Sequence, residues 1–446
     1  MGFVYNSGER VLSTTTPLFA ILLALLGTIW PDLPHLANLI GAFSLALGGV
    51  FLWNLGQSWD APAVSWAGVL LYPTFPLLLS TLGSETPLYL ALCLGAFAFY
   101  ARRNYSATAF FAALAVLTRA DGVLVPFLLA LDYLWREWSE HRSFPNIPWR
   151  ALLWFFLLLI PWHLYSWAYF GSPFPATLAA KQQQGLMSIS TLFAPGFLRV
   201  AGWYRFGWQY WVEAGLALIG VVWAIWRRRH WVTFLAWPLL YFTAYTYLGV
   251  TSYPWYYAPL VPGFFVAVGL GVSGIRNQGL GTRNQELGSE RWFSVLRPPS
   301  SVLTGLLLAA LTFTQVSALT RMRQSPDARY PIYRAVGEWL DVNTPPDAQV
   351  GMLEVGIIGF YSHRFVIGFA GLLQPAVAEQ LQLDTTYEDA ALWAVDAYSP
   401  EYLVLHAGAF PRLEQGYAAS YCRMAQKFIG AEFGYSSDMQ IYICER

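Results

Sequence analysis

The chain has 446 residues, of which 56% are hydrophobic and only 12% are charged. This composition is typical of a protein with many membrane-spanning helices, and it excludes a purely soluble globular domain. The 26 basic and 26 acidic residues cancel, so no net charge favours nucleic acid as a partner. We therefore expect an α-helical multispanning membrane protein whose main surroundings are the lipid bilayer.

A polar, turn-rich stretch from Gly2 to Pro17 precedes every hydrophobic segment. The sequence Asn6-Ser7-Gly8 predicts a turn, and the adjacent Glu9 and Arg10 have opposite charges. A signal sequence instead opens with basic residues followed by an apolar core, so this stretch is not a targeting sequence. The apolar run 18–30 is shorter than a membrane span and is bounded by prolines, which favours a helix lying in the membrane interface over one that crosses.

Ten further segments contain enough apolar residues to cross a bilayer, which takes about 15 to 22 residues. An even number of spans returns the chain to the side on which it began. The predicted spans lie at roughly 36–56, 61–79, 86–101, 106–119, 122–136, 151–169, 209–226, 231–249, 257–275 and 301–319.

Arginine residues are concentrated in alternate loops of this scheme. The positive-inside rule assigns those loops to the cytoplasm, so the N-terminal loop and everything after about residue 320 are expected to face outward. The basic loops contain Arg102 and Arg103; Arg136, Arg142 and Arg150; Arg227, Arg228 and Arg229; and Arg276, Arg283, Arg291 and Arg297. The opposite loops contain Arg10, Arg119, Lys181, Arg199 and Arg205.

After about residue 320 the hydrophobicity falls to that of a soluble α/β domain. We thus predict three parts: an external loop with an interfacial helix (1–35), a transmembrane domain (36–319) and an external α/β domain (320–446). In the last part, helical spacing covers 330–342 and 388–397, and strands are predicted at 349–354, 364–367, 401–406 and 439–444.

The three cysteines divide between the two larger domains. Cys93 lies within a predicted span, where it is expected to be inert packing. Cys422 and Cys444 both lie in the external domain, where an oxidising setting permits a disulfide. Whether they pair depends on a Cα separation that the sequence leaves open.

The N-terminal motif resembles a known family. The pattern Tyr5-Asn6-x-Gly8-Glu9-Arg10-Val11 followed by Thr15-Thr16-Pro17-Leu18 looks like the first outer-face loop of GT-C glycosyltransferases that use polyprenyl-phosphate sugars, above all the arabinofuranosyltransferase-like and mannosyltransferase-like bacterial branches. The resemblance implies transfer of a sugar to a glycan, lipid or protein on the outer face of the plasma (inner) membrane, with Glu9 and Arg10 among the substrate-binding residues.

In those relatives a transmembrane helix and an adjacent acidic pair precede this loop. The resemblance therefore implies that the catalytic pair lies upstream of Met1 and that the chain as given is inactive or nearly so. The external carboxylates of the membrane part, namely Glu9, Asp32, Glu85 and Asp121, include no adjacent pair. The alternative is a non-catalytic protein that binds or transports lipid-linked sugars.

Two further loops match the family and contain ionisable residues at the outer ends of spans. The turn Leu82-Gly-Ser-Glu85-Thr-Pro87 resembles the family's Gly-x-Glu-Thr turn, and Leu117-Thr-Arg119-Ala-Asp121-Gly122 resembles Leu-Thr-Arg-Pro-Asp-Gly. The resemblance implies that Glu85 and Asp121 bind substrate and that Arg119 binds the donor phosphate as a forked, permanently charged group. The alternatives are a helix start stabilised by Glu85 and a local Arg119–Asp121 pair.

Lys181 and Tyr256 belong to two more such segments. The stretch 170–181 resembles the family's Phe-Gly-x-Pro-x-Pro-x-Thr-x-x-x-Lys, and Lys181 is one of only two lysines in the chain, which suggests a compact charge aimed at phosphate. The alternative is a lysine that snorkels to the interface. Tyr256 lies in the aromatic cluster 253–259, which either stacks on a sugar or belongs to an interfacial aromatic belt.

Glu354 is the substrate-binding candidate of the external domain. It opens Glu354-Val-Gly-Ile-Ile-Gly-Phe-Tyr361, which resembles a strand-turn segment of the same family, although Gly368 stands where the next strand of those relatives ends in Asp. The sequence has neither a P-loop nor a His or Cys set with metal-ligand spacing. No cofactor is therefore expected, and a divalent cation is left open.

Overall fold

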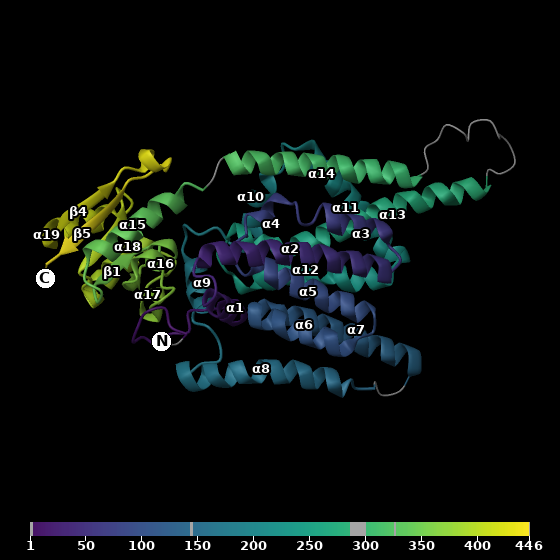
Figure 1. Ribbon diagram of the computed structural model, residues 1–446, viewed down its shortest axis with the longest axis horizontal. Coiled ribbons are helices and arrows are strands. Elements are labelled where there is room, and N and C mark those ends of the chain that lie inside the picture. The colour runs from purple at the N-terminus through teal and green to yellow at the C-terminus, as the bar shows by residue number, and fades with distance from the viewer. Residues whose placement is uncertain (1–2, 143–145, 286–299, 325–326, 446) are drawn as a thin grey trace.

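The protein is an elongated assembly of helices with a small sheet domain at one end (Figure 1). The structure, a computed structural model, describes residues 3–142, 146–285, 300–324 and 327–445. Arg291 and Arg297 of the predicted basic loops lie outside these residues. Most helices of the membrane part run along the long axis of the molecule, with α8 at one edge and α14 at the other in this view.

The helices of the membrane part follow the predicted spans. Capping supports several of them, since Asp32 accepts the backbone N–H of His35 at the start of α2, and Asn104 accepts that of Ala107 at the start of α6. The elements are α1 (Pro17–Gly27), α2 (Leu33–Ser58), α3 (Pro62–Leu70), α4 (Pro76–Leu79), α5 (Thr86–Ala101), α6 (Tyr105–Thr118), η1 (Ala120–Val123), α7 (Leu124–His141), α8 (Trp149–Phe170), α9 (Thr177–Leu186), α10 (Phe193–Gly202), α11 (Trp208–Arg227), α12 (Arg229–Leu248), η2 (Pro254–Leu260), α13 (Val261–Gln285) and α14 (Ser300–Gln324).

Four stretches of helix in the described residues are long and apolar enough to cross a membrane. They are α2, α8, α11 and the apolar stretch Pro254–Ile275 formed by η2 and the start of α13. Four more are apolar but shorter: α1, α5, α6 and the stretch Gly305–Thr320 within α14. This architecture confirms the predicted multispanning helical fold with a small α/β domain after it.

The predicted span at 61–79 is not one helix. It is divided into α3 and α4, because Pro73 and Pro76 lack the N–H that a continuous helix needs and clash with the preceding turn. Thr74, in the break, donates its hydroxyl to the carbonyl of Leu70 (2.7 Å) and so satisfies one of the freed acceptors. Broken helices are tolerated at membrane depth where their backbone is buried in protein, and this one packs against α2 and α13.

Close helix contacts in the membrane part depend on small residues. Helices α11 and α13 pack together most extensively, and a Cβ added to Gly220 or to Gly271 would overlap the backbone of the other helix. Small residues at such contacts let helix backbones approach, which is how helices gain packing energy in a bilayer. Cys93, on α5, is fully buried in the same core.

The C-terminal domain contains one five-stranded sheet in the order β2-β1-β3-β5-β4. Strands β2, β1 and β3 are parallel, while β5 pairs antiparallel with both β3 and β4. The strands are β1 (Gln349–Met352), β2 (Phe365–Gly368), β3 (Tyr402–His406), β4 (Cys422–Phe428) and β5 (Met439–Cys444). The helices and short turns are α15 (Arg329–Asn343), α16 (Ile357–Ser362), α17 (Pro375–Ala378), α18 (Tyr387–Tyr398), η3 (Leu413–Ala418), α19 (Ala419–Tyr421) and η4 (Gly430–Phe433).

Two hydrophobic clusters hold the layers of this domain together. One joins α15 to the sheet through Val336, Leu340 and Val350. The other joins α18 to the sheet through Ala394 and Leu403. The predicted strands and helices are thus confirmed, but β4 was not predicted because none of its residues is buried and its sequence has no run of apolar residues, as is common in edge strands.

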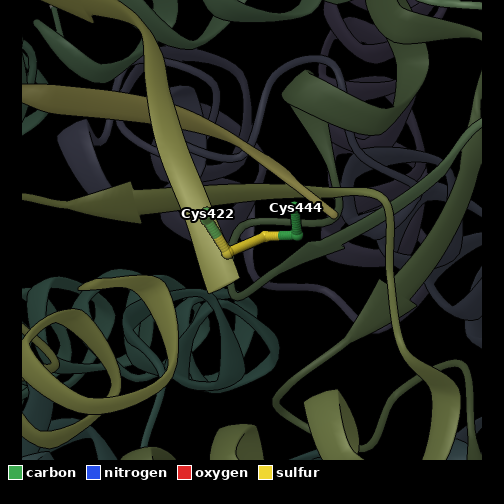
Figure 2. The surroundings of a disulfide bond; sticks show 2 residues. All are labelled: Cys422 and Cys444. Atoms are coloured by element: carbon green, nitrogen blue, oxygen red, sulfur yellow. A yellow bond between two sulfur atoms is a disulfide. The ribbon is translucent and has the colours of Figure 1, made fainter. Parts of the chain in front are cut away.

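Cys422 and Cys444 form a disulfide, which settles the question that the sequence left open (Figure 2). The two residues lie directly opposite each other on β4 and β5, with their Cα atoms 4.0 Å apart. The bond therefore ties the edge strand to its neighbour and closes the last segment of the chain onto the sheet.

The carboxyl ends of the parallel strands face the membrane part. Gln184, at the end of α9, donates to the carbonyl of Ala370 just after β2 (2.9 Å), and Met187 enters the hydrophobic core of the domain. On the free edge of β2, Asn6 both donates to the carbonyl of Val366 and accepts its N–H (each 2.9 Å), as a neighbouring strand would. The N-terminal segment thus covers an edge that would otherwise be exposed.

Candidate functional site

A short turn between α6 and α7 places Arg119 at the centre of a buried cluster. Arg119 is extended (φ −152°) where α6 ends, and the single turn η1 follows at once. Gly122 makes the turn possible, because a Cβ there would lie 2.6 Å from the carbonyl carbon of Ala115 on α6. The Arg119 side chain is consequently held against the helices rather than released into solvent.

Two carboxylates bind the Arg119 guanidinium. Asp121 accepts from Nε (3.1 Å) and from Nη2 (2.7 Å), the forked geometry that arginine favours with carboxylates. Glu85, from the loop before α5, accepts from Nη1 at 3.1 Å. The local Arg119–Asp121 pair considered above is therefore present, and it coexists with a long-range pair to Glu85.

The Glu85 carboxylate does not cap the helix that it precedes. It occupies the N-cap position of α5, but its side chain accepts no hydrogen bond from the first turn and binds Arg119 instead. Two carboxylates that are 36 residues apart in the chain thus meet at one guanidinium. The side chain of Glu85 is 21% exposed and that of Asp121 is 8% exposed, so Glu85 is the more accessible of the two.

Aromatic residues complete the cluster around Arg119. Tyr245, on α12, accepts a hydrogen bond from Arg119 Nη2 (3.0 Å) and donates to Asp121 (2.7 Å). The guanidinium carbon lies 5.3 Å from the ring centroid of Tyr89 and 6.0 Å from that of Tyr256. No local pattern in the sequence points to Tyr245 or Tyr89, because each is one of many tyrosines within apolar helices.

Lys181 approaches the same cluster from α9. Its Nζ lies 5.1 Å from the ring centroid of Tyr256, so both cations lie close to the same ring. Tyr256 is 4% exposed, unlike a residue of an interfacial aromatic belt. Burial, and secondarily the positive charge of Arg119, lowers the pKa of Lys181 to about 8, while Glu85 and Asp121 act in the opposite direction.

Two hydroxyl groups near these cations are buried without a hydrogen-bond partner in the described part of the chain. They are the hydroxyl of Tyr89 and the Oγ1 of Thr177, which lies one helical turn before Lys181 on α9. Buried polar groups are usually paired. Such groups beside two cations are suited to an anionic oxygen ligand. Asp121 and Glu85, by contrast, are occupied by Arg119, and no set of three potential metal ligands occurs in the described residues.

An open groove lies beside the C-terminal end of α6. It has a volume of about 930 Å³ and is lined mainly by apolar residues of the N-terminal segment, α1, α6 and α8. Leu117, which lines it, is two residues from Arg119 in the chain, while Pro161 and Trp162 form its α8 side. The residues of the cationic cluster do not themselves line the groove.

The other predicted site residues make different contacts. Glu9 accepts hydrogen bonds from Asn6 (2.7 Å) and from Gln374 (3.3 Å), which fastens the N-terminal segment to β2. Arg10 lies over the ring of Tyr169 on α8. Glu354 lies just after β1, with a carboxylate oxygen 3.9 Å from His406 Nε2.

Glu213 is a buried acid that the sequence reading did not single out. It lies within α11, is fully buried, and accepts a hydrogen bond from Gln315 Nε2 of α14 at 3.0 Å. Gln315 in turn accepts from Thr74 in the break between α3 and α4 (2.7 Å). A carboxyl group inside an apolar segment is itself a signal of function or special packing, and it was available from the sequence.

Solved structures with similar architecture define the fold. The apo crystal structure of ArnT from Cupriavidus metallidurans matches with a TM-score of 0.60 and 13% identity, covering 98% of this chain and 90% of that one. The chain has the GT-C fold. ArnT from the same organism bound to undecaprenyl phosphate matches the GT-C chain with a TM-score of 0.58 and 13% identity, with the same coverage.

A third GT-C match extends the comparison to archaea. The oligosaccharyltransferase AglB from Archaeoglobus fulgidus, in complex with an inhibitory peptide and a dolichol-phosphate, matches with a TM-score of 0.56 and 13% identity, covering 94% of this chain and 63% of that one. A family described as a domain of unknown function, DUF8728, matches residues 320–442 of this chain. The sequence of this chain matches no curated protein.

Proposed function

We propose that this GT-C protein is a membrane glycosyltransferase that takes a sugar from a polyprenyl-phosphate donor and transfers it to a glycan, lipid or protein acceptor on the outer face of the plasma membrane. The observation that supports this most strongly is that Arg119 and Lys181 both lie close to the Tyr256 ring, in a protein that also has a large apolar groove lined by Leu117 of the same turn region. A cationic cluster and an apolar groove suit a ligand with an anionic head and a long apolar tail.

Each part of the donor has a matching surface. The phosphate would lie between the Arg119 guanidinium, a fixed donor of several hydrogen bonds, and the Lys181 ammonium, a compact charge. The polyprenyl chain would follow the groove between α1, α6 and α8, whose apolar walls include Leu18, Ile21 and Leu158. Two of the similar solved structures carry undecaprenyl phosphate and dolichol-phosphate, which supports this class of ligand.

The proposed chemistry uses the same residues. The acceptor hydroxyl oxygen attacks the anomeric carbon, the bond from that carbon to the phosphate oxygen breaks, and the polyprenyl phosphate leaves with the electron pair. Arg119 and Lys181 stabilise the charge that develops on the departing phosphate. We assign the proton of the acceptor hydroxyl to Glu85, the more exposed of the two carboxylates at Arg119, in place of the adjacent acidic pair that the family resemblance implied.

Binding of undecaprenyl phosphate to the full chain in nanodiscs tests the proposal. Arg119→Gln and Lys181→Ala should each weaken binding by about 1.5 to 3 kcal/mol, because each removes a charge-assisted hydrogen bond. The matched control is Arg199→Ala, which removes an exposed arginine of α10. Unchanged affinity in both site variants, with the fold retained, would contradict the proposal.

A second measurement separates an enzyme from the non-catalytic alternative. A mixture of undecaprenyl-phosphate sugars and candidate acceptors is incubated with wild type and with Glu85→Gln, and release of undecaprenyl phosphate is followed. Release by wild type that the variant lacks supports glycosyl transfer. Tight donor binding without any release would favour a protein that binds or transports lipid-linked sugars.

The orientation and the domain limits form part of the proposal. We place the cluster, the segment 1–35 and the domain 320–446 outside the cytoplasm, with the membrane domain at 36–319. Single cysteines at Ser84, Ala120 and Ala179 should react with an impermeant thiol reagent from the outer side, whereas one at Glu140, in the last turn of α7 beside the predicted cytoplasmic loop, should not. Labelling of the first three only from the cytoplasm would reverse the topology.

A further inference from the structure

The carboxyl ends of β1 and β3 form a crevice of a kind that often binds ligands. In the order β2-β1-β3, the chain runs from β1 to β2 on one side and then from β2 to β3 on the other side of β1. The connection after β1 and the connection after β3 therefore lead away in different directions at the carboxyl ends of these two strands. Open α/β sheets bind ligands at such switch points. Glu354 follows β1 there, and His406 ends β3.

Polar groups from two further parts of the chain, α15 and the segment after η4, meet at this crevice. The hydroxyl of Tyr333, on α15, lies 3.3 Å from His406 Nε2 and 3.3 Å from the hydroxyl of Tyr435. A cavity of about 20 Å³ opens beneath Glu354 and His406, enough for one water molecule or one hydroxyl group. The group of residues Glu354, His406, Tyr333 and Tyr435, called here the switch-point cluster, combines hydrogen-bonding groups with flat aromatic surfaces.

The carboxylate of Glu354 is not committed to a structural ion pair. Its side chain is 40% exposed, and among the described residues its one ion pair is with His406, whose Nε2 lies 3.9 Å away, too far for a hydrogen bond. Burial lowers the pKa of His406, with Glu354 acting in the opposite direction. By contrast, Glu388 in the same domain accepts from the backbone of Arg412 at 2.6 Å and from its guanidinium at 3.0 Å.

A row of aromatic rings leads from the carboxyl ends of the strands to Lys181. The Tyr253 hydroxyl donates to Gln184 Oε1 (3.1 Å), and the Gln184 amide donates to the carbonyl of Ala370 just after β2 (2.9 Å), so Tyr253 lies near the carboxyl ends of the parallel strands. The Tyr253 ring lies 5.5 Å from the Tyr256 ring, which contacts Lys181. Trp255 stacks on Tyr253 at 4.7 Å and is 41% exposed, so it offers an open aromatic face between the two domains.

We infer that the switch-point cluster, together with Tyr253 and Trp255, binds the acceptor as a saccharide with free hydroxyl groups. Glu354 accepts hydrogen bonds from adjacent hydroxyls, His406 and Tyr333 bind a further hydroxyl, and Trp255 stacks on the sugar ring. This inference rests on the proposed glycosyltransferase function and selects a carbohydrate from the acceptor classes left open there.

Saccharide binding by the full chain in nanodiscs tests the inference. The probes are the methyl glycosides of glucose, mannose, galactose and arabinose, detected by saturation-transfer NMR, with undecaprenyl phosphate measured in parallel. We expect at least one glycoside to bind wild type, and Glu354→Gln and Trp255→Ala to weaken it about tenfold or more. Glu338→Gln, an exposed glutamate of α15, should bind the glycoside as wild type does.

The two ligands distinguish failure of the inference from failure of the proposed function. Loss of glycoside binding in Glu354→Gln, with undecaprenyl phosphate bound as tightly as before, supports the inference. Absence of glycoside binding to wild type, or equal binding by Glu354→Gln, overturns it whether or not the phosphate site is active. Loss of fold in Trp255→Ala would leave the Glu354→Gln comparison to decide.

Discussion

Arg119 and Glu213 are both buried charged residues in the membrane part, yet their surroundings differ completely. Arg119 has two carboxylates and a phenol as hydrogen-bond partners and two aromatic rings beside it. Glu213 has one amide, from Gln315, and its Oε2 has no partner in the described part of the chain. The carboxylates around Arg119 balance the charge of its guanidinium, whereas the hydrogen bond of Glu213 to Gln315 mainly joins two helices.

The difference follows from where each residue lies. Arg119 is in a turn where α6 ends, so loops and neighbouring helices can supply partners from several directions. Glu213 lies inside α11 and faces the peripheral helix α14, whose buried described residues Leu308, Leu311 and Gln315 form a narrow stripe. Because α14 leads into the C-terminal domain, the contact from Thr74 through Gln315 to Glu213 fixes the helix that connects the two domains.

The largest expected effect comes from removing the centre of the compensated cluster. Arg119→Ala leaves the carboxylates of Glu85 and Asp121 buried together without a cation, which should lower the stability of the fold by roughly 3 to 5 kcal/mol. Thermal unfolding in detergent, followed by tryptophan fluorescence, measures this loss. The variant Arg119→Met combined with Glu85→Gln and Asp121→Asn should recover much of it, and no recovery would show that charge compensation is not the cause.

A smaller effect is expected in the helix-joining contact. Glu213→Ala leaves the Gln315 amide unpaired in the apolar interior and should cost about 1 to 3 kcal/mol. Glu213→Gln keeps a carbonyl oxygen for Gln315 and should be tolerated far better. The same unfolding measurement applies, and equal destabilisation by both variants would mean that the hydrogen bond to Gln315 contributes little.

The affinity for undecaprenyl phosphate should depend on pH through Lys181. Its ammonium is charged below the pKa of about 8 and neutral above it, so a binding contribution present at pH 7 is lost as the pH rises. At pH values between the pKa of Lys181 in the free protein and its pKa in the complex, the binding free energy should weaken by up to about 1.4 kcal/mol per pH unit.

Titration of the ligand phosphate does not contribute to this pH dependence above about pH 7.5. A phosphate monoester has its second pKa near 6, so the ligand charge is nearly constant from about pH 7.5 upward. Lys181→Arg should flatten the profile because arginine stays charged, whereas Lys427→Ala, which changes the other lysine, should leave it unaltered. A profile that is the same in wild type and Lys181→Arg would remove Lys181 from the binding site.

The smallest predicted change concerns the phenol that bridges Arg119 and Asp121. Tyr245→Phe removes two hydrogen bonds but leaves the ion pairs in place, so a loss of about 1 kcal/mol is expected. Tyr247→Phe on the same helix is a matched control, since that residue is 92% exposed. Equal unfolding midpoints for the two variants would mean that the Tyr245 hydroxyl contributes nothing measurable to the stability of the cluster.

Much of the fold was accessible from local patterns in the sequence. Apolar segments of bilayer length predicted the helices, and short apolar runs between turn residues predicted four of the five strands. The break in 61–79 was also encoded, because Pro73 and Pro76 cannot continue a helix, although the apolar composition concealed it. Strand β4 was missed because none of its residues is buried, so it has no apolar run to mark it.

The sequence by itself determined which residues could form a site, since charged groups at the ends of apolar segments stand out locally. Only the tertiary structure decided that Glu85, Arg119, Lys181 and Tyr256 meet, that Tyr245 joins them, that Glu9 and Arg10 make other contacts, and that Cys422 pairs with Cys444. The physical reason is that helix and strand preferences depend on neighbours within a few residues, whereas hydrogen bonds and ion pairs between distant segments depend on how those helices and strands pack.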